Sequence, residues 1–188
     1  MMLKEFDFEL FKLINQAYSS WADTLMYALS GKFTAIPIYV ILLAILIKTY
    51  KKKIWGILFS IVILITLSDQ VSVAFKNGIE RFRPCHTEEL KSDIHLVNNH
   101  CGGTYGYYSS HASNTMALAA LLSLLLPSAI VRTFLILWVF LVGYSRIYLA
   151  AHFPLDVLSG WLAGFAFALI IFEVLIKRVF KYQIPQKI

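Results

Sequence analysis

Charged residues are scarce in this chain of 188 residues, where they make up 15% of the sequence while apolar residues make up 59%. An average globular protein has about 25% charged and roughly 45–50% apolar residues. A soluble domain of this size has too little interior to hide so much apolar surface. The composition therefore excludes an ordinary soluble domain and predicts a single domain whose apolar surface is covered by lipid.

The first residues also lack the uninterrupted apolar run of a cleavable signal peptide, because Glu5, Asp7 and Glu9 interrupt it. We therefore expect membrane insertion to depend on the internal apolar segments. No internal repeat is evident either. This absence argues against a transporter built from inverted repeats, which is the other class of membrane protein in which buried charges would bind an anion.

Positive charge exceeds negative charge, with a net charge of +6 and a pI near 9.3. Nucleic acid is not the expected partner, because the basic residues flank apolar segments, as the positive-inside rule describes. We expect them to lie beside acidic lipid headgroups on the cytoplasmic side, and no obligate protein partner is evident. The two basic groups are Lys48, Lys51, Lys52 and Lys53, and Lys177, Arg178, Lys181 and Lys187.

Five stretches approach the length of about 20 mostly apolar residues that a helix needs to cross a bilayer. They predict an all-α fold, a polytopic transmembrane helix bundle. The five stretches are Phe33–Tyr50, Ile54–Phe75, Ser110–Leu126, Ile130–Ser145 and Leu155–Ile176.

Residues 1–32 are harder to assign to the bilayer. Leu3–Tyr18 alternates apolar and charged residues in the manner of an amphipathic helix at the membrane interface. Trp21–Ser30 is too short to cross. The two segments could form an interfacial or re-entrant pair, or a poor sixth span.

If the first basic group, Lys48 to Lys53, lies in the cytoplasm, the orientation of the rest of the chain follows. Residues 76–109, the longest polar connection, and residues 146–154 then lie outside, and the basic tail, residues 177–188, lies in the cytoplasm. We expect a bacterial-type cytoplasmic membrane with the polar connection facing the periplasm or exterior.

Three clusters of ionisable residues fall on that outer side, where each is costly and therefore a functional candidate. In the first, Lys76 and Arg83 are seven residues apart and share a face if the helix persists. Together they could clamp phosphate oxygens. Asp69 lies seven residues before Lys76, where it could pair inside the bundle or remain a carboxylate near the interface.

The second cluster directly precedes an apolar segment. Ser109 or Ser110 could cap the helix, whose first-turn amides form an anion site, and His111 fits a proton donor beside a bound anion. In the third cluster, Asp156 lies four residues after His152 and could accept a hydrogen bond from one imidazole nitrogen. That bond would leave the other nitrogen free as a nucleophile.

The three clusters together resemble the signature of the type 2 phosphatidic acid phosphatase family, which includes the vanadium haloperoxidases. The signature reads K-x6-RP, PSGH and SR-x5-H-x3-D. This chain departs from the second part, PSGH, at two positions: Tyr108 stands in place of the proline, and Ser110 in place of the glycine. The matching residues are Lys76, Arg83, Pro84, Ser109, His111, Ser145, Arg146, His152 and Asp156.

The resemblance implies a membrane phosphatase that needs no metal or other cofactor. His152 would attack phosphorus and form a phosphohistidine, Asp156 would orient it, and His111 would protonate the leaving oxygen and then activate water. The residues implied to hold the phosphate oxygens are Lys76, Arg83, Ser109, Ser110 and Arg146.

The resemblance also implies the class of substrate, a lipid phosphate or diphosphate that is hydrolysed at the outer membrane face. We expect undecaprenyl diphosphate or a phospholipid-type phosphate first. Dephosphorylation of lipid A, or phosphoryl transfer to a second lipid, is the alternative. An anion transporter is the alternative from another class.

The sequence has only two cysteines, Cys85 and Cys101, both in the predicted outer connection. In an oxidising compartment they could form a disulfide. They could also remain free thiols, or bind zinc with His86, His95 and His100, although their spacing matches no standard zinc motif.

Overall fold

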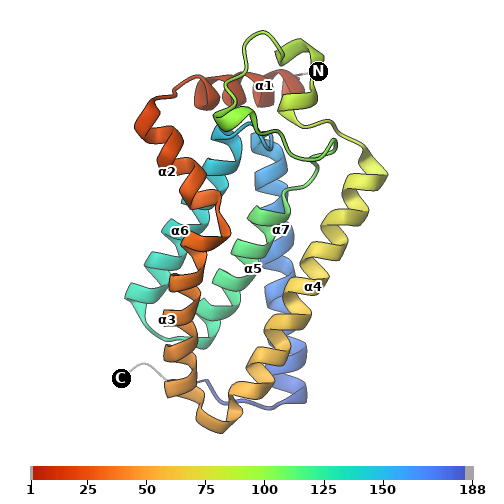
Figure 1. Ribbon diagram of the computed structural model, residues 1–188. Helices are drawn as coiled ribbons and strands as arrows, with labels where there is room; N and C mark the ends of the chain where they lie inside the picture. Colours follow the sequence, from red (N-terminus) through yellow and green to blue (C-terminus); the bar gives the residue numbers. More distant parts are fainter. Residues whose placement is uncertain (1, 185–188) are drawn as a thin grey trace.

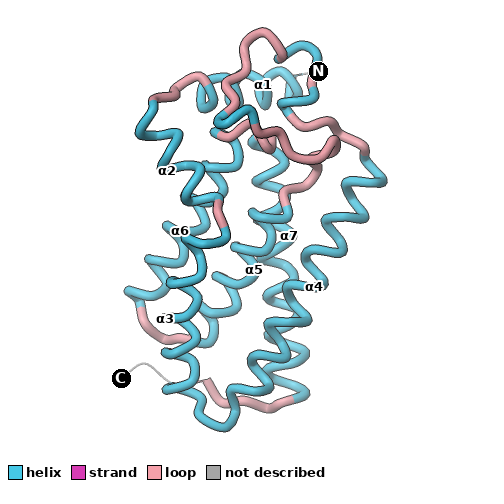
Figure 2. The backbone as a smooth tube through the Cα atoms, viewed as in Figure 1, coloured by secondary structure: helices cyan, strands magenta, loops and turns pink. Residues whose placement is uncertain are grey.

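The computed structural model describes residues 2–184, which form helices and connections without a β-strand (Figures 1 and 2). The expected all-helical class is therefore confirmed. The helices are α1 (Met2–Asn15), α2 (Ser20–Ser30), α3 (Lys32–Tyr50), α4 (Ile54–Ile79), α5 (Ser110–Leu125), α6 (Ala129–Tyr148) and α7 (Pro154–Ile171), and the shorter turns are η1 (Lys51–Lys53), η2 (Pro84–His86), η3 (Glu88–Leu90), η4 (Val97–Asn99) and η5 (Phe172–Val179).

Helix α5 is the centre of the bundle and packs against α4, α6 and, most extensively, α7. Two glycines of α7 allow the close approach. A Cβ atom at Gly160 would lie 2.6 Å from the carbonyl oxygen of Ser109, and one at Gly164 would lie 2.2 Å from that of Ser113. Larger residues would force the two helices apart. This packing sets the position of Ser109, where α5 begins.

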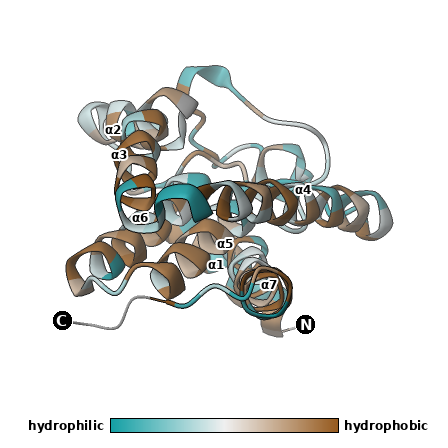
Figure 3. Cartoon of the chain, turned by 90° about the horizontal axis from the view of Figure 1, so that it is seen from below, coloured by the Kyte–Doolittle hydropathy of each residue, from teal (hydrophilic) through white to brown (hydrophobic). Residues whose placement is uncertain are grey.

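Helices α3 and α4 form one apolar stretch from Phe33 to Ile79, 47 residues long. The stretch is not one straight span, because the chain reverses direction at η1, at the lower end of Figure 1. Lys51 has a positive φ of 48° at this bend. Seen from that end, hydrophobic residues predominate along the bundle helices (Figure 3). The chain is an integral membrane protein.

The predicted count of five spans is not confirmed. Three stretches of the described residues are long and apolar enough to cross a membrane: Phe33–Ile79, Ala129–Tyr148 and Pro154–Val179. Helix α5 has 16 residues and falls short of the roughly 20 apolar residues that a helix needs to cross a bilayer. Its buried face is rich in alanine and packs on other helices.

Helices α1 and α2 lie at the upper end of the bundle. Helix α1 lies across that end (Figure 1). There Phe8 stacks on Phe153 with ring centroids 4.8 Å apart. Phe11 meets the same ring edge-on at 5.4 Å. Helix α2 packs against α6 and leads into α3. The N-terminal segment therefore covers the end of the bundle where α6 ends and α7 begins.

The long connection lies beside α1 at the same end and runs through residues 80–109 (Figure 2). It is shorter than the predicted 76–109, because α4 continues to Ile79 and keeps Lys76 in its last turn. Glu80 then ends the helix with a left-handed φ of 52°. The helix therefore does not persist to Arg83, so the condition on which Lys76 and Arg83 would share one helix face is not met.

The C-terminal segment follows α7 through the π-helical turn η5. In the predicted basic tail, residues 177–188, Lys177 pairs with Glu173 at 2.6 Å and both side chains are about half exposed. Residues 185–188 of that tail lie outside the described residues.

Candidate active site

A cavity of about 450 Å³ lies between α3, α4, α5 and α6 at the covered end of the bundle. We call it the site cavity. Six of the eight predicted catalytic or phosphate-binding residues line it: Lys76, Arg83, Ser110, His111, Arg146 and His152. The other two, Ser109 and Asp156, are fully buried beside it. Three clusters that are far apart in the sequence therefore meet in one place.

Lys76 reaches the site cavity from the last turn of α4. Its Nζ donates a hydrogen bond to Ser110 Oγ at 2.5 Å. One turn earlier, Ser72 Oγ lies 2.7 Å from the same hydroxyl and donates to the Tyr108 carbonyl oxygen at 3.1 Å. Ser110, which stands where the resembling signature has glycine, is thus fixed against α4 by two side chains.

Arg83 follows the end of α4 and is fixed by the backbone of the long connection. Its Nε donates to the Tyr105 carbonyl oxygen at 3.2 Å, and its Nη1 donates to that of Ala151 at 3.1 Å. Gly102 lies directly against the guanidinium, where a Cβ atom would come within 2.9 Å of Nη1. These contacts place a cation beside His152.

Arg146 comes from the last turn of α6, where a cation is favourable beside the helix C-terminus. Its Nη1 donates to Ser30 Oγ at the end of α2. Its Nε is buried and has no hydrogen-bond partner among residues 2–184. Arg146 therefore joins the cavity wall to α2, and Ser30 is a neighbour that the sequence did not indicate.

His152 lies between α6 and α7 and is 2% exposed. Its backbone N–H donates to the Arg146 carbonyl oxygen at 3.2 Å, which ties it to the end of α6. Burial lowers the pKa of His152 well below 6.5, and the charges of Arg83, Arg146, Lys76 and His111 lower it further. The imidazole is therefore neutral at neutral pH, the form in which a nitrogen lone pair can attack an electrophile.

The expected hydrogen bond between Asp156 and His152 is not formed. The carboxylate Oδ2 lies 3.8 Å from His152 Nδ1, and that nitrogen has no hydrogen-bond partner among the described residues. Oδ2 instead accepts a hydrogen bond at 2.9 Å from the N–H of Phe153, where α7 begins. The carboxylate serves first as a helix cap, and it acts on His152 as a nearby negative charge.

Asp156 has a second partner, Arg81, that the sequence did not indicate as a site residue. Arg81 Nη1 donates to Asp156 Oδ1 at 2.6 Å, and its Nη2 donates to Asp7 Oδ2 at 2.5 Å. Asp7 Oδ1 accepts from the N–H of Leu155 at 2.8 Å. Both carboxylates are completely buried, and the guanidinium lies 4.4 Å from the Phe153 ring centroid. One arginine thus links α1 to the start of α7.

Ser109 and His111 lie on the first turn of α5 and differ in exposure. Ser109 is fully buried, and its Oγ accepts a hydrogen bond at 3.3 Å from the N–H of Ala112. The predicted N-cap is therefore Ser109, and its own N–H donates to the Asp156 carbonyl oxygen at 3.0 Å. The His111 side chain is exposed and faces the site cavity, where a proton donor can exchange with water.

A second cavity of about 500 Å³ adjoins the site cavity on the side of the long connection. The two cavities share four lining residues: Ser30, Gly31, His111 and Arg146. Val97, His100 and Gly102 of the long connection line only the second one. The space around Arg146 and His111 is thus open both toward the bundle helices and toward the connection.

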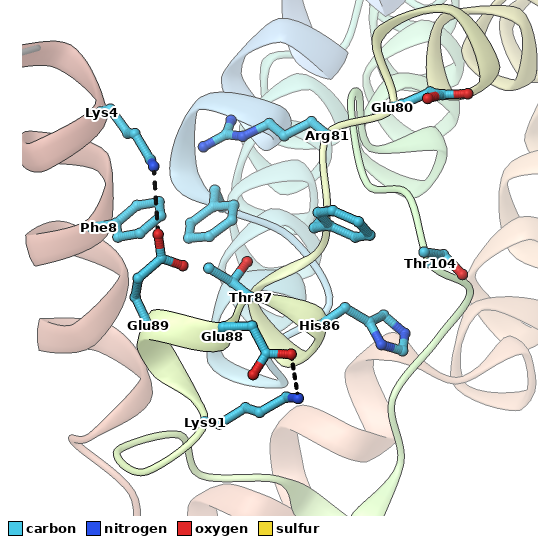
Figure 4. Close-up of a pocket in the computed structure, with 12 residues that line it drawn as sticks. Lys4, Phe8, Glu80, Arg81, His86, Thr87, Glu88, Glu89, Lys91 and Thr104 are labelled. Carbon is cyan, nitrogen blue, oxygen red and sulfur yellow. Dashed lines mark hydrogen bonds and ion pairs between the residues drawn. The ribbon is translucent and has the colours of Figure 1, made fainter.

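A third cavity, about 700 Å³, lies between α1 and the long connection (Figure 4). Four of its charged side chains form two pairs. Lys4 lies 3.8 Å from Glu89, and Lys91 lies 2.5 Å from Glu88. Arg81 borders this cavity but points its guanidinium at the two buried carboxylates. This cavity therefore lacks the excess of cations that distinguishes the site cavity.

Cys85 and Cys101 are joined by a disulfide with a Cα–Cα distance of 6.0 Å. His86 Nε2 lies 3.3 Å from Cys101 Sγ, so three of the residues considered as zinc ligands are neighbours. Both sulfur atoms are used by the bond, and a thiolate zinc site would first require its reduction. Cys85 follows Arg83 by two residues, and Cys101 directly precedes Gly102. The disulfide therefore joins the two segments whose residues Arg83 and Gly102 pack on each other.

We expect the Cys85→Ser, Cys101→Ser double variant to melt at a lower temperature than the parent protein. Opening a loop of this size costs about 3 kcal/mol in the chain-entropy model. Thermal unfolding in detergent with and without reductant measures the effect. Reductant should lower the melting temperature of the parent and leave that of the double variant unchanged, and equal sensitivity of both proteins would contradict the bridge.

Residues 53–180 match the model of the PAP2 superfamily. A lipid A 4'-phosphatase of Bacteroides thetaiotaomicron is 33% identical over 86% of this chain and 73% of its own length, and an undecaprenyl-diphosphatase of Sulfolobus acidocaldarius is 32% identical over 85% and 73%. The crystal structure of a PAP2-type phosphatidylglycerolphosphate phosphatase from Bacillus subtilis superposes with a TM-score of 0.73 at 22% identity, covering 95% of this chain and 89% of that one. The chain therefore belongs to the PAP2 superfamily.

Proposed function

We propose that this protein is an integral membrane phosphatase that removes phosphate from a lipid phosphate or diphosphate. The observation that carries the proposal is the site cavity, in which Lys76, Arg83 and Arg146 surround His152. Three cations and a neutral imidazole suit phosphoryl transfer, because that reaction depends on positioning and on charge stabilisation. Membership of the PAP2 superfamily and two relatives named as lipid phosphatases support it.

The proposed reaction has two displacements at phosphorus. In the first, the lone pair of a His152 nitrogen forms an N–P bond while the bond to the lipid oxygen breaks, and His111 gives its proton to that oxygen. In the second, His111 takes a proton from water, the water oxygen attacks phosphorus, and the N–P bond breaks. Phosphate leaves and His152 is neutral again.

The other residues of the site stabilise charge rather than move protons. Lys76, Arg83 and Arg146 would hold the phosphate oxygens, with Arg83 and Arg146 offering forked donors. Ser109 and Ser110 would shape the same pocket from the start of α5, where N–H groups favour an anion. Asp156, 3.8 Å from His152 Nδ1, would stabilise the positive charge that the ring gains on attack.

The orientation proposed for the membrane rests on the charge distribution. The lysines of η1 would lie in the cytoplasm together with the basic tail, and the site cavity would face the periplasm or exterior. Helix α5 would complete a set of five crossings by packing inside the bundle instead of against lipid. Helices α1 and α2 would lie at the outer interface, so that a lipid can enter between helices with its headgroup toward the cations.

A panel of lipids tests the proposal and ranks the substrates. Purified protein in detergent is mixed with undecaprenyl diphosphate, phosphatidate, phosphatidylglycerophosphate or lipid A, in the presence of a chelator, and released phosphate is measured. We expect release without added metal. Release that depends on a restored metal ion would contradict the mechanism. A phosphorylated second lipid in place of free phosphate would identify a phosphotransferase.

The pH dependence should report the electrostatics of His152. Burial and the nearby cations lower the pKa of His152 below 6.5, so His152 stays neutral as the pH falls through 6.5. The protein should therefore lose activity only at lower pH, where His152 is protonated. Replacing Arg83 by Gln removes one of those cations, so the His152 pKa rises and the acid limb of kcat/KM moves to higher pH. Profiles of both proteins on one substrate measure the shift. Coincident acid limbs would contradict it.

A further inference from the structure

The inner end of the site cavity is polar, although it lies among apolar helices. Four polar side chains line it: Tyr39 of α3, Asp69 of α4, Asn114 of α5 and Trp138 of α6. Asp69 lies seven residues before Lys76, about 10 Å along the helix axis, and Trp138 lies eight residues before Arg146, about 12 Å. We call these four residues the inner polar group. Each comes from a different helix, and none has a role in the proposed reaction.

Two atoms of this group are buried without a hydrogen-bond partner among residues 2–184: Trp138 Nε1 and Asn114 Oδ1. Trp138 is 6% exposed. The Tyr39 hydroxyl lies close to its indole, but no hydrogen bond of normal geometry satisfies Nε1. A buried polar atom without a partner costs roughly 1–3 kcal/mol, so two such atoms facing one cavity indicate a ligand.

The chemistry of the two atoms is complementary. The indole N–H of Trp138 can only donate, and the amide oxygen of Asn114 can only accept. Asp69 adds an acceptor when ionised, and Tyr39 can do either. A ligand that satisfies the group must therefore carry both a hydrogen-bond acceptor, such as a carbonyl oxygen, and a donor, such as a hydroxyl or amide N–H.

The direction of the cavity indicates which part of the substrate reaches this group. With the phosphate held by Lys76, Arg83 and Arg146, the lipid continues along the helices toward the apolar middle of the bundle. In a polyprenyl diphosphate that part is a second phosphate followed by hydrocarbon. An ionised phosphate could accept from Trp138 but has no donor for Asn114, and the hydrocarbon has neither a donor nor an acceptor. In an acylated sugar or glycerol lipid, that part carries ester, amide or hydroxyl groups.

We propose that the inner polar group is a binding subsite for the linkage region of an acylated lipid, where hydroxyl, amide or ester groups join the phosphate-bearing unit to its hydrocarbon. This inference rests on the proposed function and narrows its substrate class away from polyprenyl diphosphates. The phosphate binds at the cations, and the linkage region donates to Asn114 and accepts from Trp138.

The test compares two substrates in the same detergent, a hydroxyacylated aminosugar phosphate (lipid A) and undecaprenyl diphosphate. The measured quantity is the ratio of kcat/KM for the first over the second. Trp138→Phe removes the indole N–H together with three buried ring atoms, a loss that the control below shares, and Asn114→Leu keeps the size of the amide. Each should lower the ratio about fivefold, the effect of one hydrogen bond to substrate.

Trp161→Phe is the matched control. Trp161 Nε1 is also buried without a partner among the described residues, but Trp161 packs against Phe140 and does not line the site cavity. The ratio should not change in this variant. Melting temperatures distinguish a structural role, since Trp138→Phe and Trp161→Phe lose the same buried ring atoms, whereas the ratio should fall only in Trp138→Phe.

Two results would overturn the inference in different ways. Unchanged ratios in Trp138→Phe and Asn114→Leu, with phosphate released from both lipids, would contradict the subsite and leave the proposed function intact. Phosphate released from neither of these lipids nor from phosphatidate would contradict the proposed function, and the subsite with it.

Discussion

We expect phosphate release from a lipid phosphate to fall at least about 10³-fold when His152 is replaced by glutamine. Glutamine keeps a polar side chain of similar length but offers no nitrogen lone pair for attack on phosphorus. The cations of the site cavity would remain, so lipid binding should weaken far less than turnover. Phosphate release and lipid binding, measured separately on the purified variant, give this comparison.

His86→Gln provides a control for the same chemical change outside the site. His86 lies beside the disulfide and lines the cavity between α1 and the long connection. We expect its phosphate release to stay within about twofold of the parent. Turnover that survives in folded His152→Gln, as judged by its melting temperature, would exclude His152 as the nucleophile.

The second large effect is expected at Arg81, which contacts neither the site cavity nor the proposed position of the phosphate. Arg81→Met leaves the buried carboxylates of Asp7 and Asp156 without their cation, a loss of about 3–5 kcal/mol of stability. Turnover should fall about 10²-fold in the folded fraction, because Asp156 then loses the contact that fixes it beside His152. Unfolding and phosphate release measure the two effects.

Two further variants separate charge pairing from general damage. Asp7→Asn keeps the pair between Arg81 and Asp156. It should therefore lower the free energy of unfolding less than Arg81→Met does, and it should reduce phosphate release much less. Lys4→Met breaks the exposed pair with Glu89, where both side chains are about two-thirds exposed, and should change neither quantity measurably. Equal losses of turnover in Arg81→Met and Asp7→Asn would contradict the positioning of Asp156 by Arg81.

The gathering of Lys76, Arg83, Arg146 and His152 could be predicted because it depends on features that the sequence shows directly. Apolar stretches and the lysines of η1 give the order and direction of the helices. Each cluster falls at a helix end, and all those ends lie on one side. The path of the backbone from Lys76 to Arg83 could not be predicted, because α4 ends before Arg83, at Glu80, which has a left-handed backbone conformation.

The network around Asp156 could not be predicted for a different reason. Asp7 and Arg81 are 74 residues apart, and their contact forms only because α1 lies across the end of the bundle. The amphipathic pattern of Leu3–Tyr18 predicted a helix at the membrane interface and did not single out Asp7 as a buried residue. A closer signal is the four-residue spacing of Asp7, Phe11 and Asn15, which are the buried residues of α1.

The number of membrane spans could not be predicted reliably, because the length of an apolar stretch does not distinguish a membrane span from a buried helix. Helix α5 was predicted within one residue of its end, but 16 residues are too few to tell a membrane span from a buried helix. Its alanines and its glycine-lined contact with α7 indicate helix packing instead of lipid contact. Composition therefore identified the helix correctly without deciding its surroundings.

The stereochemistry at phosphorus is the most direct test of transfer through His152. A lipid thiophosphate that carries one ¹⁶O and one ¹⁸O at a phosphorus of known configuration is hydrolysed in water enriched in ¹⁷O, and the configuration of the released thiophosphate is determined. Two displacements, each with inversion, predict overall retention. Overall inversion would show that water attacks the lipid phosphate directly and would contradict a phosphohistidine at His152.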